Sequence, residues 1–345
     1  MDIDATAQKI RSGDRRALSR AITLVESARS DHRAQAAALL AALGTDRQAL
    51  RIGLSGTPGV GKSTFIESFG RMLTGHGKRV AVLAVDPSSS RSGGSILGDK
   101  TRMDLLSRDP NAFIRPSPSQ SQLGGVARRT REAIALCEAA GFDVVLIETV
   151  GVGQSETAVA EMSDLFLLLL APAGGDELQG VKRGIMETCD LILVNKADGE
   201  LKSQAMRTRA DYAGALRLLR KRAQDPEDFP KAVAVSALEE DGIAAAWDEM
   251  QALARWRKDS GIWDQRRADQ ARFWFHEEVR AGLLHQLTAD PDVAAHLTNL
   301  EGEVAKGALR PAQAAELILA SLRGEDRDRR HEPNLIGVDE GPDSS

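Results

Sequence analysis

Residues 56–63 read GTPGVGKS and have the residue types and spacing of a phosphate-binding loop. The segment matches G-x-x-x-x-G-K-[ST] and lies between an apolar run and a helical stretch, as that motif requires. Its glycines let backbone N–H groups turn inward around an anion, and the helix that follows adds the positive end of its dipole. We predict that Lys62 contacts the β- and γ-phosphates of a nucleotide and that Ser63 binds Mg²⁺. A chance glycine-rich turn is the alternative, which the flanking elements disfavour.

The sequence NKAD, which follows the apolar run LILV, indicates which base is bound. Asp198 can accept hydrogen bonds from guanine N1–H and its exocyclic amine, whereas adenine offers neither donor in that geometry. Asn195 would contact the other edge of the base, and the stem of Lys196 would cover the ring. A later strand ends in SAL, residues 236–238, where GTPases supply a backbone contact to the guanine oxygen. These features favour GTP over ATP; a polar loop at a strand end is the alternative.

A third motif, ETVGVGQSE, follows the apolar run DVVLI and is placed to contact the γ-phosphate. Ordinary GTPases have Asp-x-x-Gly at this point, and here the acid is Glu148 and the glycine is Gly151. Because Glu is one methylene longer than Asp, we expect water-mediated contact with the metal. Gln154 is a candidate for positioning the attacking water, although a structural or partner-contacting role fits its offset from the common pattern better.

Residues 86–103, DPSSSRSGGSILGDKTRM, contain too few apolar side chains to form a core of their own. They follow the second expected strand, where a GTPase presents a carboxylate near the metal. Asp86 is expected to contact the groups that bind the metal and not the metal itself. Asp99 is expected to bind the metal or to act as the general base. We predict a segment that is ordered by the triphosphate and Mg²⁺ and that relaxes on hydrolysis; a solvated loop is the alternative. The catalytic candidates are therefore Lys62, Asp99, Glu148 and Gln154.

These motifs lie within a long alternation of apolar runs and helical stretches. The runs are nearly continuous in Val, Ile and Leu, as expected for strands that are buried on both faces. We therefore predict an α/β fold, a P-loop NTPase with a doubly wound, mostly parallel sheet. The seven runs are LRIGLSG, RVAVLAVD, AFIRPS, DVVLIETVG, LFLLLLAP, LILVNKAD and AVAVSAL.

Helical patterns flank this central region on both sides. We predict an N-terminal helical region over residues 1–48, a GTPase domain over 49–255, a C-terminal helical region over 256–323 and a disordered tail over 324–345. The C-terminal region carries an aromatic and aliphatic stripe that suits either dimerisation or packing within the chain. Its members are Phe273, Trp274, Phe275, Val279, Leu283 and Leu287.

Bulk composition excludes several other classes of protein. The chain has 345 residues, of which 42% are hydrophobic, and a formal net charge of −5, so nothing predicts binding to nucleic acid or to an anionic membrane. Two cysteines support no disulfide framework and fit a reducing compartment. The longest apolar run is too short to cross a bilayer, and the first residues lack the pattern of a secretory signal. We expect a cytoplasmic bacterial protein; for a eukaryotic source, the alternative is an organelle, with the transit peptide removed.

Taken in order, GTPGVGKST, VDPSSSRSGGSILGDKTRM, ETVGVGQSE, PAGGDELQGVKRGI and LVNKAD resemble the MeaB/MMAA GTPases. These are homodimeric chaperones of adenosylcobalamin-dependent methylmalonyl-CoA mutase and were formerly labelled arginine/ornithine transport kinases. The resemblance runs from the N-terminal helices to about residue 320, and it implies a GTPase that binds GTP, GDP and Mg²⁺ and gates cofactor loading. No D-x-H-x-x-G motif is present to ligate cobalamin, so cobalamin handling is expected to belong to the mutase.

The resemblance also implies roles for particular residues. It makes residues 174–184 an additional mobile loop, which periodicity alone would have read as the start of a helix with solvated charges. In that loop Asp176, Glu177 and Lys182 would couple the nucleotide state to the mutase. The resemblance implies that Mg²⁺ is held near Ser63, Asp86, Asp99 and Glu148. Motif and resemblance together give as nucleotide-binding residues Gly56, Thr57, Pro58, Gly59, Val60, Gly61, Lys62, Ser63, Thr64, Gly151, Asn195, Lys196, Asp198, Ser236, Ala237 and Leu238.

Two other functions remain open at the level of sequence. A GTPase that delivers nickel or cobalt needs thiolate or imidazole ligands near the switches, and the six histidines and two cysteines of this chain are scattered. A kinase linked to amino-acid transport needs an acceptor pocket that no motif indicates.

Overall fold

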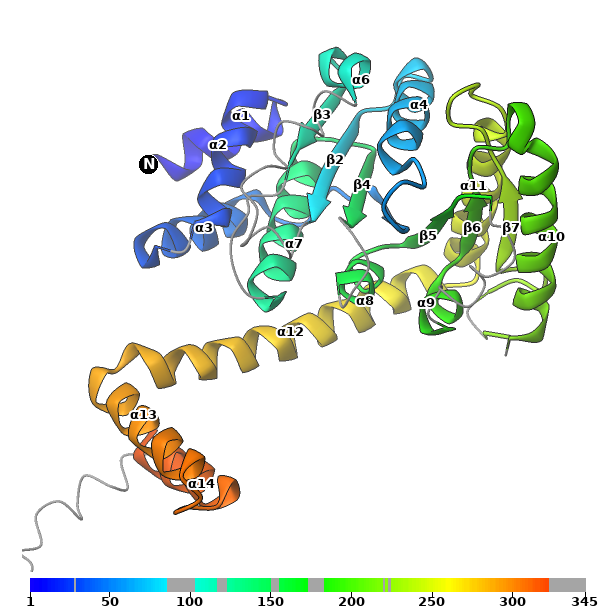
Figure 1. The fold of residues 1–345 in the computed structure, drawn as a ribbon. Coiled ribbons are helices and arrows are strands. Elements are labelled where there is room, and N and C mark those ends of the chain that lie inside the picture. Colours follow the sequence, from blue (N-terminus) through cyan, green and yellow to red (C-terminus); the bar gives the residue numbers. More distant parts are fainter. Residues whose placement is uncertain are drawn as a thin grey trace, which may run out of the picture. The chain divides into compact units, whose positions relative to one another are not determined.

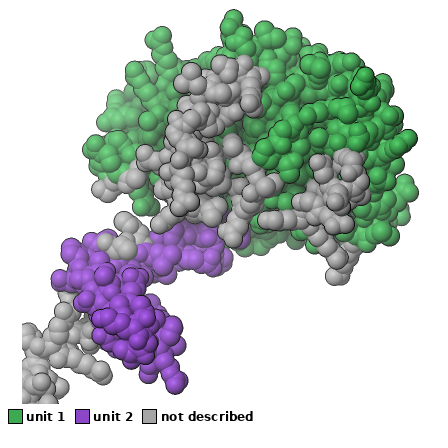
Figure 2. All heavy atoms as spheres, in the orientation of Figure 1, with its two compact units in different colours: residues 1–272 green, residues 273–345 purple. Residues whose placement is uncertain are grey.

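The structure is a computed structural model that describes residues 1–27, 29–85, 103–116, 123–149, 155–172, 183–219, 221–222 and 225–322. Two compact units divide the chain, residues 1–272 and residues 273–345 (Figure 2). The predicted tail, residues 324–345, lies outside the described residues. Among the described residues no helix is long and apolar enough to cross a membrane.

All seven apolar runs form strands, and together they make one parallel sheet, which confirms the predicted fold (Figure 1). Their order across the sheet is β3-β2-β4-β1-β5-β6-β7. Each strand is short and dominated by aliphatic residues, and in β4 and β5 every residue is buried. The strands are β1 (Leu50–Ser55), β2 (Val80–Val85), β3 (Ala112–Arg115), β4 (Val144–Thr149), β5 (Leu165–Leu170), β6 (Leu191–Val194) and β7 (Lys231–Ala234).

Helices cover both faces of the sheet, as right-handed crossovers between parallel strands require (Figure 1). One face carries α4 (Lys62–Gly75), α6 (Asp104–Arg108) and α11 (Ile243–Asp259). The other carries α7 (Leu123–Ala139), α8 (Ser155–Ala160), α9 (Arg183–Thr188) and α10 (Lys202–Leu218). One core lies between the sheet and the first of these layers, with Phe65, Phe69 and Met250 among its buried side chains.

The N-terminal region forms three helices, α1 (Ile3–Arg11), α2 (Arg15–Glu26) and α3 (Ser30–Leu43), which pack with α7. Asp2 and Asp14 cap the first two helices with their side chains, which accept from one backbone N–H at the start of α1 and from two at the start of α2. Arg115 at the end of β3 pairs with Glu26 of α2 and so joins this helical region to the sheet.

The C-terminal region is also helical, with α12 (Ile262–Ala289), α13 (Pro291–Ala305) and α14 (Pro311–Leu322). In unit 2 a small core forms around Leu300, Ala314 and Ile318, and Leu287 packs against it. Within the predicted stripe Trp274 is buried, whereas Phe273, Phe275, Val279 and Leu283 are exposed. Packing within the chain therefore accounts for only part of the stripe.

Aspartates precede β4, β5 and β6 and fix the amino-terminal edge of the sheet. Each accepts a hydrogen bond of 2.8 Å from a backbone N–H at the start of a neighbouring strand, a donor that would otherwise have no strand partner. The three pairs are Asp143 with Arg79, Asp164 with Arg51, and Asp190 with Phe166.

Arg257 of α11 joins two of these acidic positions in a buried ionic network. Its guanidinium donates to Asp190 and Asp225, at 2.6 Å each, and to the backbone oxygen of Asp164 at 2.7 Å. Burial alone would raise the pKa of Asp190, but the charges of Arg257, Arg266 and Arg222 lower it from 3.8 to about 2. The stabilisation from ionised Asp190 is thus complete above pH 3.8 and is lost as the pH falls through about 2.

We expect Asp190→Ala to lower the free energy of unfolding by about 3–5 kcal/mol, because it leaves the charge of Arg257 buried with less compensation. The matched control is Asp269→Ala, which removes an exposed pair with Arg272 and should cost less than about 1 kcal/mol. Urea unfolding followed by circular dichroism measures both. Equal losses in the two variants would contradict a structural role for the buried network.

Candidate functional site

The phosphate-binding loop follows β1, the middle strand of the sheet, and leads into α4. Two of its glycines are required by space and by backbone conformation. A Cβ on Gly56 would lie 2.3 Å from the backbone oxygen of Leu169, and one on Gly61 would lie 2.6 Å from Asn195 Nδ2. Gly61 also has φ +93°, which favours glycine over other residues. The loop can therefore adopt this path only with glycine at both positions.

Lys62 is the first residue of α4, and its side chain is buried across the loop that precedes it. Its Nζ donates to the backbone oxygens of Gly56 at 2.7 Å and Thr57 at 3.3 Å. Ser63 follows at the same helix N-terminus and is partly exposed. The structure thus brings together an ammonium group, a hydroxyl group and the positive end of a helix dipole, which suits a bound polyphosphate.

The predicted guanine residues come together from two loops at the carboxyl ends of β6 and β7. Ser236 donates a short hydrogen bond to the Asp198 carboxylate at 2.5 Å, and the backbone N–H of Ala197 donates to the oxygen of Val235 at 3.1 Å. Ser236 and Ala237 are buried, Asp198 and Lys196 are partly exposed, and Leu238 is exposed. The NKAD and SAL segments therefore form one surface.

Asn195 connects this surface to the phosphate-binding loop. Its Nδ2 donates to the oxygen of Val60 at 2.9 Å, and its Oδ1 accepts from the N–H of Ala237 at 2.9 Å. The NKAD pattern predicted that Asn195 contacts an edge of the base. In the structure its amide holds the two loops together. The bond to Val60 uses one of the two N–H groups of Nδ2, which leaves the second N–H as a donor for the base.

Glu148 is at the carboxyl end of β4, beside β1 and β2. It is only 5% exposed, and its position at this edge of the sheet is the one predicted. Other predicted residues cannot be placed, because they lie outside the described residues. These are Asp86, Asp99, Gly151, Gln154, Asp176, Glu177 and Lys182.

Sequence reasoning missed a buried chain of polar side chains below the phosphate-binding loop. Thr149 donates to the Ser55 hydroxyl at 3.1 Å, and Ser55 donates to Glu156 at 3.2 Å. Ser55 directly precedes Gly56, whereas Glu156 lies in the first turn of α8, so the chain joins β1 and β4 to this helix. The sequence signal for this chain was Glu156, the acidic residue that ends ETVGVGQSE and to which the motif assigns no role.

A second missed contact holds the guanine loop to α4. The Ser68 hydroxyl lies 2.5 Å from the backbone oxygen of Ala237, to which it donates, and 3.1 Å from the backbone oxygen of Thr64. Ser68 lies five residues after Ser63 along the helix, a spacing that no nucleotide motif specifies. The arrangement as a whole, a phosphate-binding loop beside a guanine loop on a parallel sheet, defines a P-loop NTPase of the GTPase class.

Comparisons with known proteins identify the family. The sequence model described as "Methylmalonyl Co-A mutase-associated GTPase MeaB" matches residues 18–292. The chain belongs to this family, and it is a GTPase. The predicted resemblance is thereby confirmed.

Individual relatives agree with this assignment. The chain is 49% identical to the mouse "Methylmalonic aciduria type A homolog, mitochondrial" over 90% of this chain and 77% of the relative. It is 46% identical to "GTPase ArgK" of Escherichia coli over 83% of this chain and 86% of the relative. A crystal structure described as a LAO/AO transport system kinase superposes with a TM-score of 0.72 and 36% identity, covering 93% of this chain and 97% of that one.

Asp198→Asn tests the predicted base recognition. The amide keeps one oxygen but loses the charge and presents N–H groups to the donors of guanine, so we expect the affinity for GTP to fall about a hundredfold relative to ATP. Competition binding with GTP and ATP measures this preference. Asp211→Asn, at an exposed position of α10, is the matched control and should behave as wild type. An unchanged preference in Asp198→Asn would remove the residue from base recognition.

Proposed function

We propose that this GTPase is a chaperone of an adenosylcobalamin-dependent methylmalonyl-CoA mutase, whose cofactor loading it gates and which it protects. The observation that carries the proposal is the family match over residues 18–292, because the family's description names the mutase. The mouse relative, which is named for methylmalonic aciduria, supports the same assignment. The proposed location is the bacterial cytoplasm.

The described residues suit transfer of a phosphoryl group to water without a covalent intermediate. The P-loop backbone and Lys62 hold the phosphates and offset their charge, and the Asp198 loop holds the base. Ser63 and Glu148 supply hydroxyl and carboxylate oxygens, the ligand type that Mg²⁺ prefers, and Asp86 and Asp99 complete the proposed set. When bound, Mg²⁺ would neutralise charge on the phosphates. Asp99 and Gln154 are proposed to act on the attacking water.

Nucleotide-dependent gating requires that the GTP and GDP states bind the mutase with different affinities. We propose that residues 86–103 and 174–184 supply this difference, with Asp176, Glu177 and Lys182 in contact with the mutase. The polar chain from Thr149 through Ser55 to Glu156 concerns the γ-phosphate motif, because it links the strand of that motif to β1.

We further propose a homodimer formed through the C-terminal helices. Phe273, Phe275, Val279 and Leu283 leave large apolar side chains exposed on α12. Exposed clusters of this kind in a soluble chain commonly mark a contact with another protein.

A second candidate is a kinase, because the related crystal structure is described as a transport system kinase. Incubation with GTP labelled at the γ-phosphate separates the two functions. Label that appears only in inorganic phosphate supports a GTPase chaperone, whereas label on arginine or on a transport protein supports a kinase.

We expect Lys62→Ala to abolish GTP hydrolysis, because no other described side chain places a positive charge across the phosphate-binding loop. Phosphate release in single-turnover conditions measures the effect. Lys78→Ala, at an exposed position between α4 and β2, is the charge-matched control and should keep the wild-type rate. Undiminished hydrolysis by Lys62→Ala would end the assignment of the phosphate site.

For the chaperone, we expect the affinity for purified mutase to differ at least about fivefold between a non-hydrolysable GTP analogue and GDP, the lower end of usual allosteric coupling. Isothermal titration calorimetry of the full chain with each nucleotide measures it. Equal affinities would refute nucleotide gating, and no binding in either state would refute the mutase as partner.

A further inference from the structure

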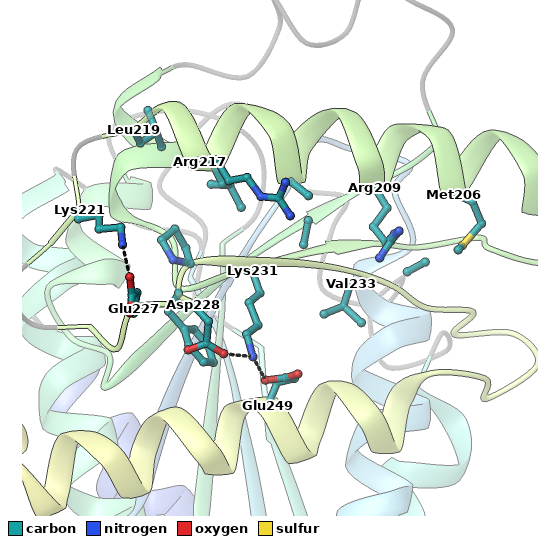
Figure 3. A pocket seen from close by; sticks show the side chains of 16 residues that line it. Met206, Arg209, Arg217, Leu219, Lys221, Glu227, Asp228, Lys231, Val233 and Glu249 are labelled. Carbon is teal, nitrogen blue, oxygen red and sulfur yellow. Dashed lines mark hydrogen bonds and ion pairs between the residues drawn. The ribbon is translucent and has the colours of Figure 1, made fainter.

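A groove of about 920 Å³ runs along β7, the strand at one edge of the sheet (Figure 3). It is lined by α10 on one side, by β7 with the segment before it, and by Glu249 of α11. None of its lining residues belongs to the predicted nucleotide or metal site. Nucleotide binding therefore does not account for the groove.

The backbone of β7 offers hydrogen-bonding groups to this groove. The N–H groups of Lys231 and Val235 donate to Asp190 and Val194, on the β6 side of the strand. Because parallel pairing uses every second residue of a strand, the N–H and C=O of Ala232 and the N–H of Ala234 point away from β6. An extended peptide can pair with these groups as an eighth strand.

The lysine of this short edge strand does not point outward along the edge. Exposed strand edges commonly carry an outward lysine, but Lys231 is turned toward α11, where it pairs with Asp228 at 2.6 Å and Glu249 at 2.7 Å. Side chains alternate between the faces of a strand, so Ala232 and Ala234 face α10. These small residues leave the space that forms the groove.

Two arginines of α10 give the groove its charge preference. Figure 3 shows Arg209 and Arg217 extending from α10 toward β7. The lining has four cationic and three anionic side chains, and the anionic ones pair with Lys221 and Lys231. Within the described part of the chain no carboxylate pairs with either arginine, and Arg209 Nε is buried without a hydrogen-bond partner.

The spacing of these arginines matches an extended chain. They lie eight residues apart on one face of α10, which is about 12 Å along a helix. Residues i and i+4 of a strand point to the same face and are about 13 Å apart. Two acidic side chains with that separation could each form a charge-assisted pair with one arginine.

We propose that this groove binds an extended acidic segment of a partner protein, which adds to the sheet beside β7. The backbone of Ala232 and Ala234 pairs with the segment, and Arg209 and Arg217 select carboxylates four residues apart. The proposal depends neither on the bound nucleotide nor on the identity of the mutase, so its failure would leave the proposed chaperone function untouched.

The test uses the full chain with GDP and a fluorescein-labelled peptide, Val-Glu-Val-Thr-Val-Glu-Val, as the probe. Fluorescence anisotropy should show saturable one-to-one binding. The variants Arg209→Ala and Arg217→Ala should each bind the peptide about tenfold more weakly, because each variant loses one charge-assisted pair. Arg207→Ala, at an exposed position of α10 outside the groove, is the matched control and should bind as wild type. All three variants should hydrolyse GTP at the wild-type rate, which shows that they are folded.

Two further measurements separate strand addition from simple anion binding. A peptide N-methylated at alternate residues should bind at least about tenfold more weakly, since it cannot pair with β7. Bound peptide should also slow amide exchange at Ala232 and Ala234 of β7, whereas exchange in α10 stays unchanged. Absence of saturable binding would overturn the proposal. Equal binding of the N-methylated peptide, or displacement of the peptide by equimolar inorganic phosphate, would also overturn it. Loss of self-association on peptide binding would overturn it too, because that result would assign the edge strand to contact with a second copy of the chain.

Discussion

The side chain of Asn195 holds the nucleotide site together. Its amide joins the oxygen of Val60 to the N–H of Ala237, so one residue at the end of β6 fixes the distance between the phosphate-binding loop and the guanine loop. Gly61 permits this close approach, because any side chain there would strike the amide. The relative position of the two loops is therefore fixed by the protein itself, so a nucleotide that spans both would need less ordering on binding.

The amino-terminal ends of the strands, opposite the nucleotide loops, are stabilised by charged side chains. Parallel strands begin with backbone N–H groups that have no partner in the ladder, and Asp143, Asp164 and Asp190 satisfy them. Buried carboxylates are unfavourable unless they are paired, which explains why Arg257 and Arg267 extend from α11 and α12 to the same edge. Because these arginines come from helices after the last strand, the sheet is fully stabilised only when the chain has folded as far as α12.

The sequence was sufficient to predict the sheet and the motifs that border it. Continuous aliphatic runs are typical of strands buried on both faces, so all seven were found, and a phosphate-binding loop has a spacing that few other structures share. It was insufficient for contacts whose partners are distant in sequence. Ser68 and Ala237 are 169 positions apart and Ser55 and Glu156 are 101 apart, and neither pair follows any local pattern. The same limit hid the ionic network, because the charges of Asp190 and Arg257 look like ordinary surface charges when the sequence is read alone.

The guanine loop is the direct continuation of β7, and this continuity relates the open edge of the sheet to the nucleotide site. Val235 is held from two sides, by its own N–H to Val194 and by the N–H of Ala197 to its oxygen. Ser236 and Ala237 follow, and they are tied to Asp198, Asn195 and Ser68. A strand whose end is fixed by so many hydrogen bonds cannot shift along its axis without breaking several of them. The edge of β7 is therefore a rigid template rather than a deformable one, and rigidity of this kind lowers the conformational cost of pairing with an extended chain.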